Sequence, residues 1–363
     1  MPGLFSNEKI NTGRQVELDI AKALSIIFMI FLHTVMVVSG FNNSISPAYD
    51  FIIGNVLGMP CAAPVFMFCM GIGIVYSRHS QWDLMIKRGV KLYLLGILVN
   101  VFEFFLPGFV CGTLLGRWDI FPMAGGLLLF CADILAFAGL SFILMGILKK
   151  FNISNKWMII IAVVMSVIGT LLRGTDFGIP VLNLFFAHFI GSAGGFSAFP
   201  LFDWFIFPIA GLIWGQYFIR AKDKRQFFRF WPIFIIVAFV YFYVTSQVMG
   251  EGIFSNDVHW YYFMTTFDAV FCIIYAHGNI GLCYYLSKYL PDKIKKGFSI
   301  LSSNINYIYI VQWCFIPLGV IFLAYLFKNL IFTDLICSIF STCILILSTA
   351  VAVYYKKFKT SKS

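Results

Sequence analysis

Long apolar runs, each bounded by polar or charged clusters, divide this 363-residue chain. The first run, residues 20–40, has the length of about 20 residues that an α-helix needs to cross a bilayer. Nine more runs lie at residues 49–76, 90–106, 121–147, 157–172, 203–220, 231–249, 260–287, 300–325 and 331–355. Because lipid offers the backbone no hydrogen-bond partner, each run must form a helix. The sequence predicts an all-α integral membrane protein with about ten transmembrane helices.

The composition agrees with this class, since 60% of the residues are hydrophobic and only 12% are charged. A soluble core of this length cannot bury so much apolar surface. Residues 1–19 are polar and lack the pattern of a cleavable signal, so we expect them to remain as a cytoplasmic segment. The second run contains Gly58, Pro60 and Pro64, and several runs exceed a straight crossing, which predicts long or broken helices.

The basic residues alternate between the two sides of the predicted bundle. All but three of the 26 Lys and Arg fall in the N-terminal segment up to and including Lys22, the tail at 356–363, or the loops near 77–91, 148–156, 220–229 and 288–296. The exceptions are Arg117, Arg173 and Lys328. By the positive-inside rule, both termini are then cytoplasmic and the number of spans is even. The net charge of +10 therefore reflects topology and contact with anionic lipid, not nucleic-acid binding.

We find no internal repeat and no long linker, so residues 1–363 are predicted to form a single transmembrane domain. The nine cysteines lie mostly within apolar runs and lack metal-ligand spacing, so no metal site is expected. The stretch 173–202 is rich in Gly, Phe and Pro and is predicted to hold a short re-entrant or interfacial helix.

His33 lies inside the first apolar run, eleven residues after Lys22. In a helix this spacing places both side chains on one face, about 16 Å apart along the axis. An ionisable ring at membrane depth is costly and is usually functional. We therefore take His33 as the candidate catalytic residue, with Lys22 as a cation near the membrane edge.

Other polar residues also fall within the apolar runs. Asn100 and Glu103 are three residues apart on one helical face, and Asn304 and Gln312 share a face of the run 300–325. Asp133 is expected mid-way along the run 121–147. For each, a hydrogen bond between helices explains the residue at least as well as a chemical role.

Lys87, Arg88 and Lys91 place three cations within five residues at the start of the third run. Such a cluster can hold phosphates, although alone it is more often a topology anchor. Together with Lys22 and His33 on one helical face, the cluster suggests a binding site at the cytoplasmic side for a phosphorylated donor. The reactive end of this donor would reach a base within the membrane. Coenzyme A thioesters have this shape.

The stretch from Arg14 to His33 resembles the first span of the transmembrane acyltransferase superfamily, which includes acyltransferase-3 proteins and the heparan-alpha-glucosaminide N-acetyltransferase-like group. The spacing of Asp19 and His33 matches the family pattern. Further similar segments follow in the family's order at residues 64–71, 87–96, 133–140 and 199–215. The chain departs from the family pattern at two places: Lys22-Ala23 replaces Arg-Gly, and Lys91 replaces the second Arg of Arg-x-x-Arg. Both changes keep the positive charge but lose the pair of parallel hydrogen bonds that a guanidinium can donate.

The resemblance implies roles for several residues. His33 matches the catalytic position, Arg88 and Lys91 the donor-binding pair, and Asp19 with Lys22 a structural or gating pair. The implied activity is transfer of an acyl group, usually acetyl, from cytoplasmic acyl-CoA to a hydroxyl or amine of a glycan or lipid-linked saccharide. Acyl-CoA is then a co-substrate, no bound cofactor is expected, and the location is a cell membrane, of the bacterial cytoplasmic type. The sequence leaves open whether the chain forms a homo-oligomer.

Two questions of mechanism and class stay open at the level of sequence. A neutral imidazole can take a proton from the acceptor as a general base, or can itself form an acyl-histidine. A secondary transporter is the alternative function, because broken helices and buried ionisable residues also suit it. The lack of an inverted repeat and the cluster of ionisable residues near the first run favour the acyltransferase. The resemblance also implies acceptor contacts, for which the aromatic residues at 184–204 and Trp260 are candidates.

Overall fold

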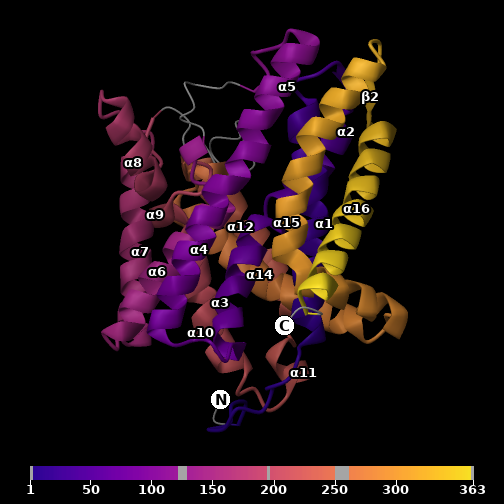
Figure 1. Cartoon of the computed structure of the whole chain (residues 1–363). Helices are drawn as coiled ribbons and strands as arrows, with labels where there is room; N and C mark the ends of the chain where they lie inside the picture. Colours follow the sequence, from indigo (N-terminus) through magenta and orange to yellow (C-terminus); the bar gives the residue numbers. More distant parts are fainter. Residues whose placement is uncertain (1–2, 122–128, 194–196, 250–260, 361–363) are drawn as a thin grey trace. The chain divides into compact units, whose positions relative to one another are not determined.

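The computed structural model describes residues 3–121, 129–193, 197–249 and 261–360, and its secondary structure is almost entirely helical. Figure 1 colours the elements by their position along the chain. They are α1 (Val16–Val38), β1 (Asn43–Ser44), α2 (Pro47–Asp50), η1 (Phe51–Gly58), α3 (Ala63–Tyr76), α4 (Trp82–Asn100), η2 (Val101–Phe105), α5 (Leu106–Leu115), α6 (Ile134–Lys150), α7 (Asn155–Leu172), α8 (Pro180–Ile190), α9 (Leu201–Trp204), α10 (Ile206–Phe218), α11 (Lys224–Phe227), α12 (Trp231–Met249), α14 (Thr266–Ser287), α15 (Asp292–Leu326), β2 (Phe332–Thr333) and α16 (Asp334–Thr360).

The prediction of an all-α, multi-pass membrane protein is confirmed. Within the described residues, nine helical stretches are long and apolar enough to cross a membrane. The predicted run 121–147 falls partly outside the described residues, and its described part holds α6, which has 17 residues. The short helix predicted within 173–202 is α8, which spans 11 residues.

The predicted break in the second span is also confirmed. A π-helical segment, η1, ends at Gly58, and residues 59–62 form turns before α3 begins. Pro60 lies in this break, where its missing N–H removes no helical hydrogen bond. Pro64 is the second residue of α3, where a helix needs no N–H donor. A second π-helical segment, η2, joins α4 to α5 within the third span.

The chain forms two compact units, each assembled from three separate segments. Unit 1 comprises Met1–Leu18, Pro64–Ile97 and Phe130–Lys288, and unit 2 comprises Asp19–Ala63, Leu98–Leu129 and Tyr289–Ser363. Each unit is described by itself below.

Unit 1 is built on close helix crossings at glycines. A Cβ added to Gly71 of α3 would lie 2.0 Å from the Pro208 carbonyl oxygen of α10. A Cβ on Gly211 of α10 would in turn lie 1.9 Å from the Phe68 carbonyl oxygen of α3. The two backbones are therefore in direct contact, as small residues allow between membrane helices. Elsewhere in unit 1, α12 packs along α14.

Unit 2 contains α15 and α16, which lie side by side (Figure 1). The two-residue strands β1 and β2 pair in parallel, with Asn43 opposite Phe332. Next to this pairing, the Asp334 carboxylate accepts hydrogen bonds from the Ser46 backbone N–H at 2.8 Å and from its hydroxyl at 2.6 Å. These bonds fix the segment after α1 against the start of α16.

The Gly71 crossing gives a test of unit 1 with a matched control on the same helix. We expect Gly71→Ala to lower the free energy of unfolding by about 1–3 kcal/mol, because its methyl group meets rigid backbone. Gly73→Ala adds the same methyl group where no atom lies within 4 Å and should not lower stability, because Ala also has the higher helix propensity. Thermal unfolding in detergent measures both, and equal midpoints would contradict this packing.

Candidate functional site: the helix carrying His33

The first helix, α1, runs without interruption from Val16 to Val38. It therefore contains both Lys22 and His33, and the helical geometry that places them on one face is confirmed. Its buried positions are mostly small or aliphatic, including Ala21, Ala23 and Ile30. Both Lys22 and His33 are half-buried.

Three side chains of α15 surround the His33 imidazole within unit 2. The Gln312 amide nitrogen, Nε2, lies 3.3 Å from His33 Nδ1. The Trp313 ring stacks on the imidazole with 4.2 Å between centroids and an interplanar angle of 28°. The Tyr309 ring approaches edge-on, with centroids 6.3 Å apart. The Trp313 indole thus packs against one face of the imidazole, and the Gln312 amide contacts its Nδ1 atom.

A second polar contact joins the same two helices. The Ser302 hydroxyl donates a hydrogen bond of 2.7 Å to Asp19 Oδ1, and both residues are buried. Residue numbers rise in both helices from this contact to the one between His33 and Gln312, so α1 and α15 run parallel. Asp19 therefore has a structural contact that anchors α1 to α15.

Two other predicted polar residues of unit 2, Asn100 and Asn304, donate to backbone carbonyl oxygens. The Asn100 side-chain amide donates to the Leu129 carbonyl oxygen at 2.8 Å. The Asn304 amide donates to the Ile300 carbonyl oxygen of its own helix at 2.8 Å. Glu103 is buried within η2. Of the predicted supporting residues, the structure therefore brings Gln312 to His33.

The predicted position of Asp133, mid-way along a span, is wrong. Asp133 is the N-cap residue of α6, with an extended backbone, and the helix begins at Ile134. The residue before it, Ala132, accepts backbone hydrogen bonds from the N–H groups of Ala198 and Phe199 at 3.1 and 3.0 Å. This pairing holds the chain extended up to Asp133, so the carboxylate lies at a helix start in unit 1.

The predicted donor-binding cations Lys87, Arg88 and Lys91 are exposed on α4, in unit 1. Lys87 forms an ion pair of 3.8 Å with Asp83, one helical turn earlier. The Arg88 guanidinium lies over the Phe142 ring of α6, 4.5 Å from its centroid. Such a stack leaves the edges of the guanidinium available to other partners. His33, Asp19 and Lys22 belong to unit 2.

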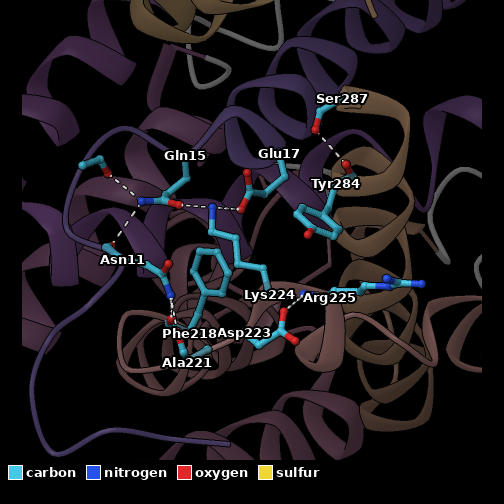
Figure 2. A network of polar contacts seen from close by, with 11 residues as sticks. Asn11, Gln15, Glu17, Phe218, Ala221, Asp223, Lys224, Arg225, Tyr284 and Ser287 are labelled. Atoms are coloured by element: carbon cyan, nitrogen blue, oxygen red, sulfur yellow. Dashed lines mark hydrogen bonds and ion pairs between the residues drawn. The ribbon is translucent and has the colours of Figure 1, made fainter. Parts of the chain in front are cut away.

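The segment that leads into α1 is held by a polar network (Figure 2). Lys224 Nζ donates to the Gln15 side-chain oxygen and, at 2.6 Å, to the Glu17 carboxylate. Gln15 and Glu17 are buried, whereas Lys224 is half-buried. The Asn11 amide donates to the carbonyl oxygens of Phe218 and Ala221 at 2.9 and 2.7 Å. These bonds fix the residues before α1 to the end of α10.

Residues 184–204, which are predicted to meet an acceptor, contain the later part of α8 and the short helix α9. The loop before α8 lies next to this range. The Asp176 carboxylate accepts hydrogen bonds from the Asn183 amide and the Gly178 N–H, which hold the pKa of Asp176 below its ordinary value. Phe177 stacks on Phe186 with centroids 4.5 Å apart. Trp260 lies outside the described residues.

Sequence reasoning missed Ser302, Trp313 and Lys224. Two of these were visible as a periodic pattern, because Ser302, Tyr309 and Trp313 recur on the helical face that carries Gln312. Lys224 stands among other loop cations, and nothing in its sequence context distinguishes it. Among the described residues, no three His, Cys, Asp or Glu side chains gather where they could hold a metal ion.

Comparison with known proteins decides the family. A family model described as an acyltransferase domain, of the acyltransferase-3 type, matches residues 15–355. The chain belongs to this family. No curated protein and no solved structure matches the sequence. The protein is therefore a membrane acyltransferase, and the match favours this class over the transporter considered as an alternative.

Proposed function

We propose that this acyltransferase moves an acyl group, acetyl in the simplest case, from cytoplasmic acyl-CoA to a hydroxyl or amine of a glycan or lipid-linked saccharide in the cell envelope. The observation that carries this proposal is the contact of His33 with Gln312 and Trp313. It provides a base of fixed orientation inside a membrane-spanning helix. Polysaccharide modification at the bacterial cytoplasmic membrane is the setting that we infer.

Gln312 is proposed to set the tautomer of His33. Rotation of the amide by 180° places Oε1, in place of Nε2, against His33 Nδ1. The Nδ1–H group of His33 then donates to this oxygen. The other ring nitrogen, Nε2 of His33, keeps its lone pair for an incoming proton. This orientation also gives a partner to Gln312 Oε1, which is buried and accepts no hydrogen bond in the described structure. Gln312 is thus a positioning residue.

In the proposed step, the acceptor oxygen or nitrogen attacks the thioester carbonyl while His33 Nε2 takes its proton. The C–S bond then breaks, and the departing CoA thiolate receives the proton from the imidazolium. General-base assistance of this kind contributes about 10²-fold to 10⁴-fold in rate. An acyl-histidine route would use the same nitrogen as a nucleophile.

The donor's phosphates are proposed to bind Lys87, Arg88 and Lys91, with Lys22 as a further cation along α1. All three cations on α4 are exposed, and Arg88 is held by its stack on Phe142. Exposed aromatic side chains such as Phe185 on α8 are suited to pack against an acceptor sugar.

The primary test is His33→Ala with acetyl-CoA and a glycan acceptor. We expect kcat to fall by about 10²-fold or more, since either catalytic route loses its reacting nitrogen. Release of the CoA thiol by purified protein measures the rate. His79→Ala, an exposed histidine on the loop before α4, serves as the control and should retain full activity. Full activity in His33→Ala would remove the imidazole from the mechanism.

A second test addresses the role of Gln312. Gln312→Leu should lower kcat by about 10²-fold while KM for acetyl-CoA changes little, because the base is misoriented but the donor site is intact. Gln312→Glu retains an oxygen that can accept from Nδ1–H and should recover part of the loss. A merely structural role would predict that Glu, a charge at membrane depth, is worse than Leu.

A third test concerns the donor. The double variant Arg88→Ala with Lys91→Ala should raise KM for acetyl-CoA by about tenfold, with a smaller dependence on salt than the wild type, since it loses partly exposed phosphate contacts. Lys156→Ala removes an exposed charge at the start of α7 and should leave KM unchanged. Equal KM values in all three proteins would place the donor elsewhere.

A further inference from the structure

A cavity of about 270 Å³ lies within unit 1, and three cations line it. Lys9 comes from the N-terminal segment, Lys149 from the last turn of α6, and Arg220 from the residues after α10. Ser80 and Gln216 add polar groups, and the remaining four lining side chains are aliphatic. Among the residues that the structure describes, no Asp or Glu lines the cavity.

No acidic side chain in the described part of the chain neutralises the positive charge of this cavity. Among the described residues, Lys9, Lys149 and Arg220 form no ion pair. The Lys149 ammonium donates to the Ser80 carbonyl oxygen. Like charges that converge on one cavity repel each other and attract an anion.

The dipoles of the neighbouring helices explain why two of these three positions carry a cation, but not the third. Lys149 and Arg220 lie at the C-terminal ends of α6 and α10, where cations offset the helix dipole. Lys9 belongs to no helix, so the dipole gives no reason for its presence. The chain nevertheless holds the segment around Lys9 in place, since the N–H groups of Ser6 and Ile10 donate to the carbonyl oxygens of Arg220 and Ile219, each at 2.8 Å.

The topology predicted from the basic loops puts this cavity at the cytoplasmic surface. Its cations and Ser80 come from the N-terminal segment and from three loops whose basic composition predicts a cytoplasmic location. The C-terminal ends of α3, α6 and α10 meet here, as expected for spans that all run toward the same side. Phosphorylated ligands and anionic head groups are available on that side.

We infer that this cavity is a binding site for a phosphate group. Its three cations are opposite in sign to a phosphate ester, and its aliphatic wall of Ile74, Val75, Leu212 and Ile219 suits the carbon atoms next to that phosphate. Lys87, Arg88 and Lys91 do not line it, so it is separate from the proposed donor contacts. The phosphate belongs to the head group of an anionic phospholipid or to a soluble nucleotide, and both carry the recognised group.

The test uses the full chain in phosphatidylcholine nanodiscs and two probes. Native mass spectrometry follows binding of phosphatidylglycerol, and calorimetry follows binding of adenosine 3′,5′-bisphosphate. The triple variant Lys9→Gln, Lys149→Gln and Arg220→Gln should lose affinity for the bound probe by about tenfold or more. The control Lys150→Gln, Lys156→Gln and Lys222→Gln removes the same charge from exposed residues outside the lining and should bind like the wild type.

The two probes distinguish the sources of the phosphate. Loss confined to phosphatidylglycerol identifies a lipid site, and loss confined to the bisphosphate identifies a nucleotide site. Equal affinity of the triple variant and the control, or no binding of either probe by the wild type, would overturn the inference.

A variant without a change in charge tests the cavity itself. Val75→Phe adds volume to the aliphatic wall and should weaken binding as the triple variant does. Undiminished affinity in a folded Val75→Phe protein would place the phosphate on the open basic surface and contradict a cavity site. Thermal unfolding reports whether this variant folds, and the charge variants decide the question if it does not.

Discussion

A polar side chain in a membrane-spanning helix must find its partner within the protein, because lipid offers none. In unit 2 this constraint joins α1 to α15 twice, through Asp19 with Ser302 and through His33 with Gln312. The first contact fixes one end of α1. The second holds an imidazole by an amide and an indole, and the proposed chemistry depends on that orientation.

Close packing of small residues supports the elements of unit 1 in the same way. Besides the crossing of α3 and α10, Gly89 of α4 and Gly139 of α6 approach so closely that a Cβ on either would lie within 2.7 Å of the other's carbonyl oxygen. This crossing brings Phe142 beneath Arg88. Glycines in these helices therefore determine where an exposed guanidinium is held, although they carry no chemistry themselves.

Much of the architecture follows from one-dimensional features of the sequence. The length of the apolar runs predicts the helices, and the prolines near Gly58 predict the break in the second span. The distribution of Lys and Arg predicts which way the spans cross the membrane. The spacing of Lys22 and His33 likewise fixes their common face once α1 is helical. Such features are local, so they can be found without knowing which helices are neighbours.

What could not be predicted depends on pairing between distant segments. The face of α15 that carries Gln312 and Trp313 was visible, but not that it meets α1. Asp133 lies at a helix start because Ala132 pairs with residues 198 and 199, more than sixty positions later. The bonds of Lys224 to Gln15 and Glu17 span more than two hundred residues, and hydropathy contains no information about them.

The proposed mechanism requires that the reactive end of a CoA thioester reaches the His33 imidazole. Bromoacetyl-CoA tests this directly, because a nucleophilic nitrogen at the thioester position displaces bromide and keeps a covalent mass label. We predict that peptide mass spectrometry finds the adduct on His33 and that excess acetyl-CoA prevents it. Labelling that leaves His33 unmodified, or that acetyl-CoA does not suppress, would contradict this role of His33.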